Sequence, residues 1–203
     1  DPDYEQSGEQ SIAAKARARG VSVWEELYDI VIAREGRELI YLPIYNYTEM
    51  SYDNVLTMMR HPQALIGLSD GGAHVGTVCD ASFPSYLLKY WTQERTRGER
   101  IALPSAVQML TSDLADFLGL ADRGRIKVGL KADLNVIDLD NLKLEAPHMV
   151  ADLPAGGQRL LQGATGYRAT IVSGKVVVRD DVITDARPGR LIRAGQTLAM
   201  AAE

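Results

Sequence analysis

ALIGLSD at residues 64–70, running into GGAHVG at residues 71–76, is the stretch of this sequence that decides the fold class. A short apolar run that ends in a carboxylate and a glycine turn is typical of a buried strand whose carboxyl end faces a site. Upstream, the continuously apolar ELIYLPIYNY at residues 38–47 predicts a second strand buried on both faces. A short helix starting at Ser51 lies between the two runs. Strand, helix and strand with brief connections predict an α/β unit.

Helical patterns flank this unit on both sides. Residues 11–35 predict two helices, the first ended by Gly20 and the second capped by Ser22. Downstream, the apolar spacing of residues 86–91 predicts another helix. Residues 104–118 predict a further helix, which begins at a proline and has one apolar face.

The pattern changes after residue 121, so we expect two structural parts, residues 1–121 and a small β-module with a tail at 122–203. GRIKVGLKADLNVID at residues 124–138 predicts two short strands around a glycine-containing turn. TIVSGKVVVRD at residues 170–180 predicts a hairpin with a Ser-Gly turn. The stretch between them, residues 145–166, is expected to be irregular because it carries prolines and several glycines.

Composition excludes several classes of protein. Hydrophobic residues make up 46% of the 203 residues and charged residues 24%, which is an ordinary globular balance. The net charge is −5 and the basic residues are scattered, so no nucleic-acid partner is expected. The single cysteine, Cys79, excludes an internal disulfide and a cysteine-based zinc cluster. No apolar run approaches the roughly 20 residues of a membrane span, and no leader is visible, so we expect a cytoplasmic protein without a membrane partner.

Asp70 is the leading candidate for chemistry because it stands where the apolar run ends and the glycine turn begins. A carboxylate at a strand end can bind a metal or take a proton from an attacking water. The alternative is an Asx-type turn with no functional role. His74, four residues later, is a candidate substrate contact, proton donor or metal ligand, and the alternative is an ordinary hydrogen-bonding loop residue.

Other polar residues are weaker candidates. Asn46, at the end of the first apolar run, is positioned to donate to a substrate carbonyl or to form a turn. Asp80 and Cys79 are close enough in sequence to line the same cleft, but a nucleophilic cysteine needs a base that nothing in the sequence places, so a structural cysteine is favoured. A structural role is also favoured for His61, whereas His148 lies in the stretch expected to be irregular and has no partner visible in the sequence. The glycines match no phosphate-binding motif.

Three segments of the chain resemble the amidohydrolase superfamily, and in particular its N-acyl-D-amino-acid deacylase (D-aminoacylase-like) branch. They are HPQALIGLSDGGAHVGTVCDAS at 61–82, SAVQMLTSDLADFLGLADRGRIKVGLKADLNVID at 105–138, and RATIVSGKVVVRDD at 168–181 with ARPGRLIR at 186–193. The second segment is shared widely across amidohydrolases. The first and third segments point more narrowly to the deacylase branch.

The resemblance implies an α/β fold: the C-terminal part of a (β/α)8 metal-dependent hydrolase barrel, followed by the small β-module. Asp70 matches the last-strand aspartate, which touches the metal and carries the proton from water to the leaving amine. His74 matches a substrate-holding histidine, with Asn46 and Asp80 as further substrate contacts. The implied cofactor is zinc, and the implied substrate is an N-acyl-D-amino acid or a similar small amide.

The sequence departs from the family pattern in its histidines. It has three histidines and no His-x-His pair, whereas a zinc site normally needs at least three protein ligands. We therefore expect a C-terminal portion that lacks most of the metal site, so that this chain need not bind zinc by itself. Two alternatives stay open. One is a catalytically silent module that forms homo-oligomers or associates with the missing N-terminal part; the other is a cyclic amidase parent of the hydantoinase or dihydroorotase type.

Overall fold

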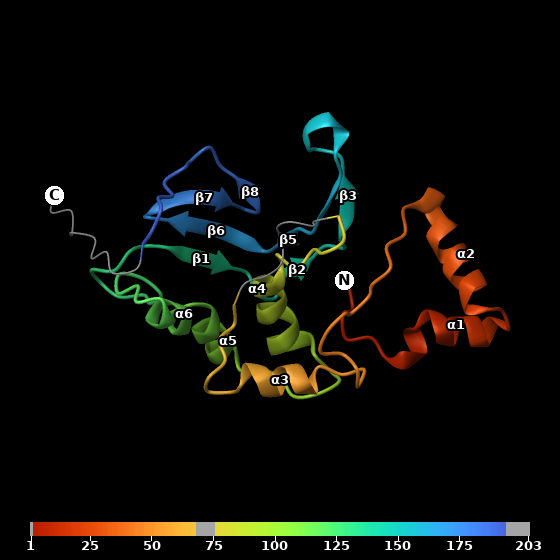
Figure 1. Ribbon diagram of the computed structural model, residues 1–203. Coiled ribbons are helices and arrows are strands. Elements are labelled where there is room, and N and C mark those ends of the chain that lie inside the picture. Colours follow the sequence, from red (N-terminus) through yellow and green to blue (C-terminus); the bar gives the residue numbers. More distant parts are fainter. Residues whose placement is uncertain (1, 68–75, 194–203) are drawn as a thin grey trace. The chain divides into compact units, whose positions relative to one another are not determined.

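The computed structural model describes residues 2–67 and 76–193 (Figure 1). The chain divides into two compact units. The first unit comprises Asp1–Ala64 with Thr96–Glu99, and the second comprises Leu65–Arg95 with Arg100–Glu203. The boundary expected after residue 121 falls inside the second unit and stays a prediction.

The first unit is helical, and local capping explains where its first helices begin. Its elements are η1 (Gly8–Gln10), α1 (Ile12–Arg19), α2 (Val23–Gly36) and α3 (Asp53–Met59). Ser11 Oγ accepts from the amide of Ala14 at 3.2 Å, and Ser22 Oγ accepts from the amide of Glu25 at 3.1 Å. Gly20 ends α1 in the left-handed region at φ 71°. The prediction of two helices over residues 11–35 is confirmed, although the backbone of α2 leaves helical geometry at Ala33 (ψ 151°).

The strand expected at residues 38–47 is wrong. The structure has no strand there, and most of its apolar side chains, among them Leu42, Ile44 and Tyr45, are exposed, although Tyr47 is buried. A strand exists only where a second strand supplies hydrogen bonds, and no described residue pairs with this stretch. Residues 64–67 are likewise irregular, and residues 68–70 lie outside the described part of the chain. The homo-oligomer expected for a catalytically silent module stays a prediction.

The helices of the second unit are α4 (Phe83–Tyr86), the π-helical η2 (Leu87–Glu94), α5 (Leu103–Leu110) and α6 (Ser112–Phe117). The helix predicted over residues 104–118 is broken in two, because Thr111 adopts φ −128° and ψ −85°. The apolar core of this unit draws on both helices and strands. Its buried residues are Leu87, Leu88, Trp91, Ile101, Ala106, Ala115, Leu142, Leu144 and Leu160.

A four-stranded antiparallel sheet forms most of the β-module, in the order β1-β6-β7-β8. The strands are β1 (Leu134–Ile137), β6 (Tyr167–Val172), β7 (Lys175–Arg179) and β8 (Val182–Ile183). The predicted hairpin is confirmed: Ser173 (φ 51°) and Gly174 (φ 78°) form its two-residue turn. Asp180 and Asp181 repeat the same geometry before β8, at φ 45° and 65°. Primed turns match the twist of the strands that they join.

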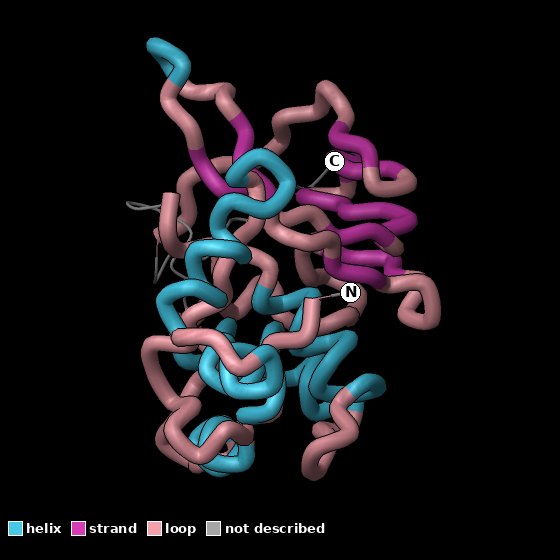
Figure 2. Tube along the Cα trace, turned by 90° about the vertical axis from the view of Figure 1, so that its right-hand side faces the viewer, coloured by secondary structure: helices cyan, strands magenta, loops and turns pink. Residues whose placement is uncertain are grey.

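Residues 145–166, expected to be irregular, instead contain strands, so that expectation is wrong. β2 (Lys143–Leu144) pairs with β5 (Ala164–Thr165), and β3 (His148–Val150) pairs with β4 (Arg159–Leu161). The β3–β4 hairpin projects from the module with η3 (Pro154–Gly156) at its tip (Figures 1 and 2). Its short strands carry no long apolar run, so their pairing was not readable from composition.

The first of the two strands expected within residues 124–138 is also absent. Ile126 and Val128 are 91% and 101% exposed and make no strand pairing in the described chain. Every strand pair that the structure describes is antiparallel, so the described residues do not contain the parallel α/β unit that the sequence predicts.

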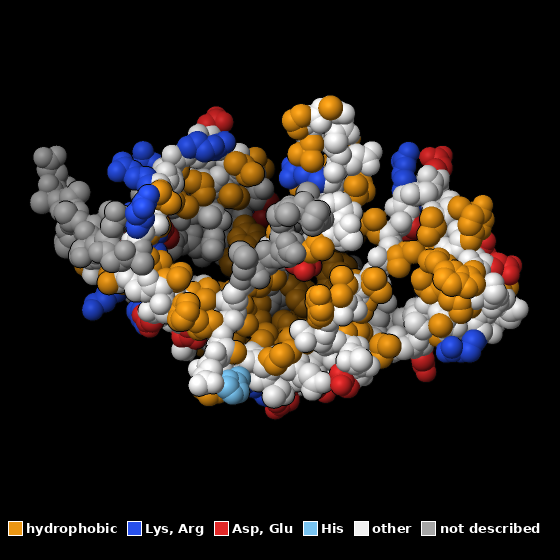
Figure 3. Space-filling model, in the orientation of Figure 1, with side chains coloured by type: hydrophobic (Ala, Val, Ile, Leu, Met, Phe, Trp, Pro, Cys, Tyr) orange, Lys and Arg blue, Asp and Glu red, His pale blue; other side chains and the backbone are white. Residues whose placement is uncertain are grey.

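Figure 3 shows further apolar side chains gathered over α2 and over β6–β8. No helix in the described ranges is long and apolar enough to cross a membrane.

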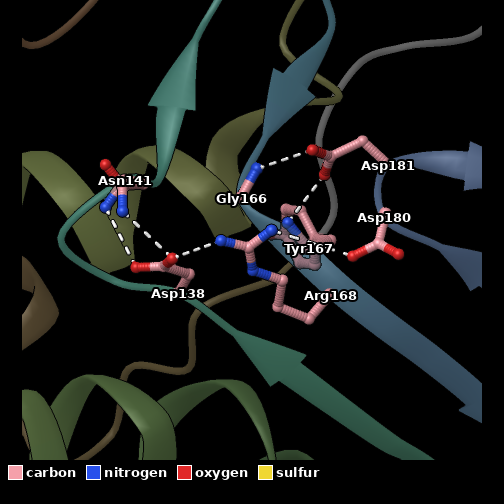
Figure 4. A network of polar contacts seen from close by, with 7 residues as sticks. All are labelled: Asp138, Asn141, Gly166, Tyr167, Arg168, Asp180 and Asp181. Carbon is pink, nitrogen blue, oxygen red and sulfur yellow. Dashed lines mark hydrogen bonds and ion pairs between the residues drawn. The ribbon is translucent and has the colours of Figure 1, made fainter.

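Charged side chains tie the ends of the four-stranded sheet together (Figure 4). Arg168 on β6 donates to Asp138 at 2.8 Å and lies 3.7 Å from Asp180. Asp181 accepts from the amides of Gly166 and Tyr167 at 3.0 and 2.7 Å. The β7–β8 turn is therefore held to the start of β6 by a carboxylate that satisfies two backbone donors.

Four carboxyls of the second unit make its stability sensitive to acid. Hydrogen bonds from Arg125, Arg123 and Arg159 lower the pKa values of Asp116, Asp122 and Asp152, and hydrogen bonds from Asn141 and then Arg168 lower the pKa of Asp138. A carboxyl with a lowered folded pKa stabilises the fold above its unfolded pKa, about 3.9 for Asp, and that contribution is lost as pH falls through the folded value.

We therefore expect the Tm to hold between about pH 5 and 7 and to fall below about pH 4. The measurement is circular dichroism melting across this range. Asp138→Asn should make the acid dependence shallower, and Asp140→Asn, at a nearby exposed position, serves as the control. An identical acid slope in the wild type and Asp138→Asn would contradict the prediction. High salt should also weaken the contributions of Asp116 and Asp152, which are exposed, more than those of the half-buried Asp122 and Asp138.

Candidate functional site

The two leading sequence candidates, Asp70 and His74, lie outside the described residues. The described chain resumes at Gly76. The part of the candidate site that the structure describes comprises residues 76–82 and the elements that hold them. Within this segment Val78 and Cys79 are half-buried and Asp80 is exposed. The segment leads directly into α4.

Residues 80–82 form the entrance to α4. The Asp80 carbonyl accepts from the amide of Phe83 at 3.1 Å. Ser82 occupies the N-cap position, where a serine hydroxyl usually accepts from the first turn of the helix. Its hydroxyl makes no such bond and instead donates to Oε1 of Gln162 at 2.5 Å. The helix entrance is thus tied to the β-module by a contact across 80 residues of sequence.

Cys79 is not an activated nucleophile. Burial raises the pKa of its thiol, and the neighbouring Asp80 carboxylate raises it further. A raised pKa keeps the sulfur protonated at neutral pH, whereas nucleophilic cysteines are thiolates with lowered pKa values. The structural interpretation of Cys79 is therefore the one that the geometry supports.

One face of the helix that follows contacts the β-module through polar side chains. Ser85 Oγ lies 2.6 Å from the hydroxyl of Tyr167. Lys89 Nζ donates to the carbonyls of Leu139 and Asp140 at 3.3 and 3.1 Å. With Ser82, these residues stand three and four positions apart, which places them along one side of a helix. The segment that carries Asp80 is consequently mounted on a helix fixed to the sheet module.

The remaining candidates fall elsewhere. Asn46 is exposed, adopts φ 59°, and belongs to the first unit, so its alternative role as a turn residue is supported. His61 follows α3, and its Nδ1 accepts from the amide of Gln63 at 3.2 Å, in keeping with a structural role. His148 starts β3, opposite Leu161, and is not in an irregular stretch as expected. Among the candidates that lie in the described residues, the structure brings together only Cys79 and Asp80.

Sequence reasoning missed Ser82 and Gln162, which hold the candidate segment. Ser82 ends the family-like segment at residues 61–82 and Gln162 lies in none of the quoted segments, so only covariation of the two residues in related sequences would have indicated the contact. A metal site is not formed by the described residues either. In residues 2–67 and 76–193, no group of three or more His, Cys, Asp or Glu side chains is arranged to hold a metal ion.

Comparison with known proteins assigns the chain to a family. Residues 25–178 match the sequence profile described as "Amidohydrolase family". The chain belongs to the amidohydrolase family. It is 31% identical over 160 residues to an N-acyl-D-glutamate deacylase from Alcaligenes xylosoxydans xylosoxydans. The aligned region covers 77% of this chain and 30% of the relative. This match supports the D-aminoacylase-like branch.

A second relative of this amidohydrolase has a different printed activity. A 5-methylthioadenosine/S-adenosylhomocysteine deaminase from Halobacterium salinarum is 31% identical over 154 residues, covering 74% of this chain and 34% of the relative. The chain thus spans about a third of the length of these curated relatives. No solved structure matches it.

Membership has three consequences for this chain. The family implies a TIM-barrel-related fold, and its relatives are hydrolases or deaminases that act on C–N bonds. Amidohydrolases are also generally metal-dependent. The described residues do not supply a set of metal ligands.

Proposed function

We propose that this chain is the C-terminal portion of an amidohydrolase that hydrolyses N-acyl-D-amino acids or similar small amides. The observation that carries the proposal is the family match over residues 25–178 together with the 31% identity to an N-acyl-D-glutamate deacylase. The matched residues include the segment that carries Asp70 and Asp80. Zinc is the proposed metal of the whole enzyme, with most of its ligands contributed by sequence other than this chain.

Asp70 is the proposed acid–base residue. It takes the proton of the attacking water and delivers it to the departing amine nitrogen, so that amide and water become carboxylate and amine. A single carboxylate can serve both steps because it returns to its ionised state after each turnover. His74 and Asp80 are the proposed substrate contacts.

The experiment compares two proteins: this chain, and the longest open reading frame that contains it. We expect the longer protein to release D-glutamate from N-acetyl-D-glutamate and the chain alone to show no turnover above background. Asp70→Asn in the longer protein should lower kcat by about 10²- to 10⁴-fold, the range for losing a general acid–base group. Asp80→Asn should act mainly on KM. Wild-type kcat in Asp70→Asn would contradict the proposed role.

The substrate panel separates the rival activities. Two relatives of 31% and 33% identity that are named as 5-methylthioadenosine/S-adenosylhomocysteine deaminases favour a second candidate, deamination of 5-methylthioadenosine. Ammonia release from that nucleoside without release of D-glutamate would favour the deaminase. Opening of hydantoin or dihydroorotate rings would favour a cyclic amidase. Preference for N-acetyl-L-glutamate would contradict the D-amino-acid assignment.

A further inference from the structure

Ser82 and Gln162 form a side-chain bond that joins the exit of the candidate segment to the β-module. Ser82 Oγ donates to Gln162 Oε1 at 2.5 Å, and both side chains are half-buried. Because this hydroxyl makes no capping bond to α4, the bond to Gln162 is the polar contact by which it restrains the helix entrance. A partly buried bond of this kind is screened less by water than one at the surface.

The acceptor is itself held in place. Gln162 Nε2 donates to the carbonyl of Glu145 at 2.9 Å, and the Glu145 amide donates to the carbonyl of Gly163 at 2.9 Å. These contacts fix the amide plane of Gln162, so Ser82 meets a preorganised acceptor.

Asp80 is only two residues from this bond. Its carbonyl accepts from Phe83, and Phe83 directly follows Ser82, so residues 80–83 form one short hydrogen-bonded turn with Ser82 inside it. We propose that Gln162 is a positioning residue, which through Ser82 holds the turn that presents Asp80. The link to substrate rests on the proposed function. The restraint of residues 80–83 by the Ser82–Gln162 hydrogen bond, called the clamp below, does not.

The competing interpretation is that the bond is one of several that attach the helix to the module. The Ser85–Tyr167 and Lys89 contacts do this as well. A positioning role predicts a local effect on residues 79–82 when the Ser82–Gln162 bond is removed. A general attachment predicts the same effect when the Ser85–Tyr167 bond is removed.

Cys79 is a built-in probe of the turn, since it is the single cysteine of the chain and lies three residues before Ser82. Its half-buried thiol should react slowly with DTNB, and opening of the turn should both expose it and restore its ordinary acidity. In the chain as it stands, we expect Ser82→Ala and Gln162→Ala each to speed labelling by about 3- to 10-fold, the effect of losing one net hydrogen bond.

Three comparisons make the test specific. The double variant should label no faster than either single variant, because both remove the same bond. Ser82→Thr, which keeps the hydroxyl, should restore slow labelling. Tyr167→Phe, which deletes one hydroxyl on the same interface, should stay within about twofold of wild type because the Ser82 bond remains. Circular dichroism melting confirms that each variant is folded.

Unchanged labelling in Ser82→Ala and Gln162→Ala would overturn the clamp, as would equally fast labelling in Tyr167→Phe. In an active longer protein, Gln162→Ala should raise KM several-fold with little change in kcat. An unchanged KM alongside faster labelling would overturn the positioning role. Absence of amide hydrolysis by the wild type would instead overturn the proposed function and leave the labelling result standing.

Discussion

Replacing Gly166 with alanine is expected to lower the free energy of unfolding of the second unit by roughly 2–4 kcal/mol. Gly166 adopts φ +107°, a backbone conformation that L side chains rarely adopt. An added Cβ would lie 2.8 Å from Leu142 Cα and 3.0 Å from its amide nitrogen. Both are backbone atoms of Leu142, which is buried, so neither can move aside as a flexible side chain can.

The strain would also disturb the hydrogen bonds that Gly166 makes. Its carbonyl accepts from Asp138 at 2.9 Å, and its amide donates to Asp181 at 3.0 Å. Urea unfolding followed by circular dichroism measures the loss. Gly174→Ala is the matched control: its φ is +78°, but no atom lies within 4 Å of an added Cβ, so only backbone strain of about 1–2 kcal/mol is expected. Equal losses in the two variants would contradict the steric explanation.

Replacing Trp91 with alanine is expected to lower the free energy of unfolding by about 3–5 kcal/mol. The side chain is 4% exposed, and the guanidinium carbon of Arg95 lies 4.8 Å from its ring centroid. Its removal leaves a cavity beneath a buried arginine and ends a cation–π contact. The backbone carbonyl of Trp91 also accepts a hydrogen bond from the amide of Ile101 at 2.8 Å.

The second tryptophan of the chain supplies the control. Trp24 lies on α2 in the first unit and is 78% exposed, so Trp24→Ala should change stability by no more than about 0.5 kcal/mol. The measurement is urea unfolding by far-ultraviolet circular dichroism, with fluorescence of each single-tryptophan variant as a second probe. Trp91 emission should be blue-shifted relative to Trp24. Comparable destabilisation by both substitutions would show that Trp91 is not the core residue that its burial indicates.

The features predicted correctly from sequence are those with short-range causes. Ser11 and Ser22 begin helices because a hydroxyl can accept from an amide three residues ahead, and Gly20 ends one because it tolerates positive φ. Ser173 and Gly174 form a hairpin turn for the same local reason. The family was predicted from the same kind of information, short motifs read directly from the chain, and the comparison confirms it.

The predictions that failed concern pairing between distant residues. The apolar run at residues 38–47 has the composition of a strand, but no partner in the described chain supplies its hydrogen bonds. The proline- and glycine-bearing stretch at residues 145–166 lacks that composition, yet its segments pair with one another and with β2. β-Propensity describes how a side chain fits a sheet, and the existence of the sheet depends on the partner strand.

For the candidate site, the sequence by itself determined the family and singled out Asp70, His74 and Asp80 as candidates, of which Asp70 and His74 lie outside the described residues. Only the tertiary structure decided that Ser82 bonds Gln162, which is 80 residues away in the chain, and that burial keeps Cys79 protonated. The reason is physical. Motifs and caps are set by neighbours along the chain, whereas burial, pKa values and side-chain clamps depend on which distant segments folding brings into contact.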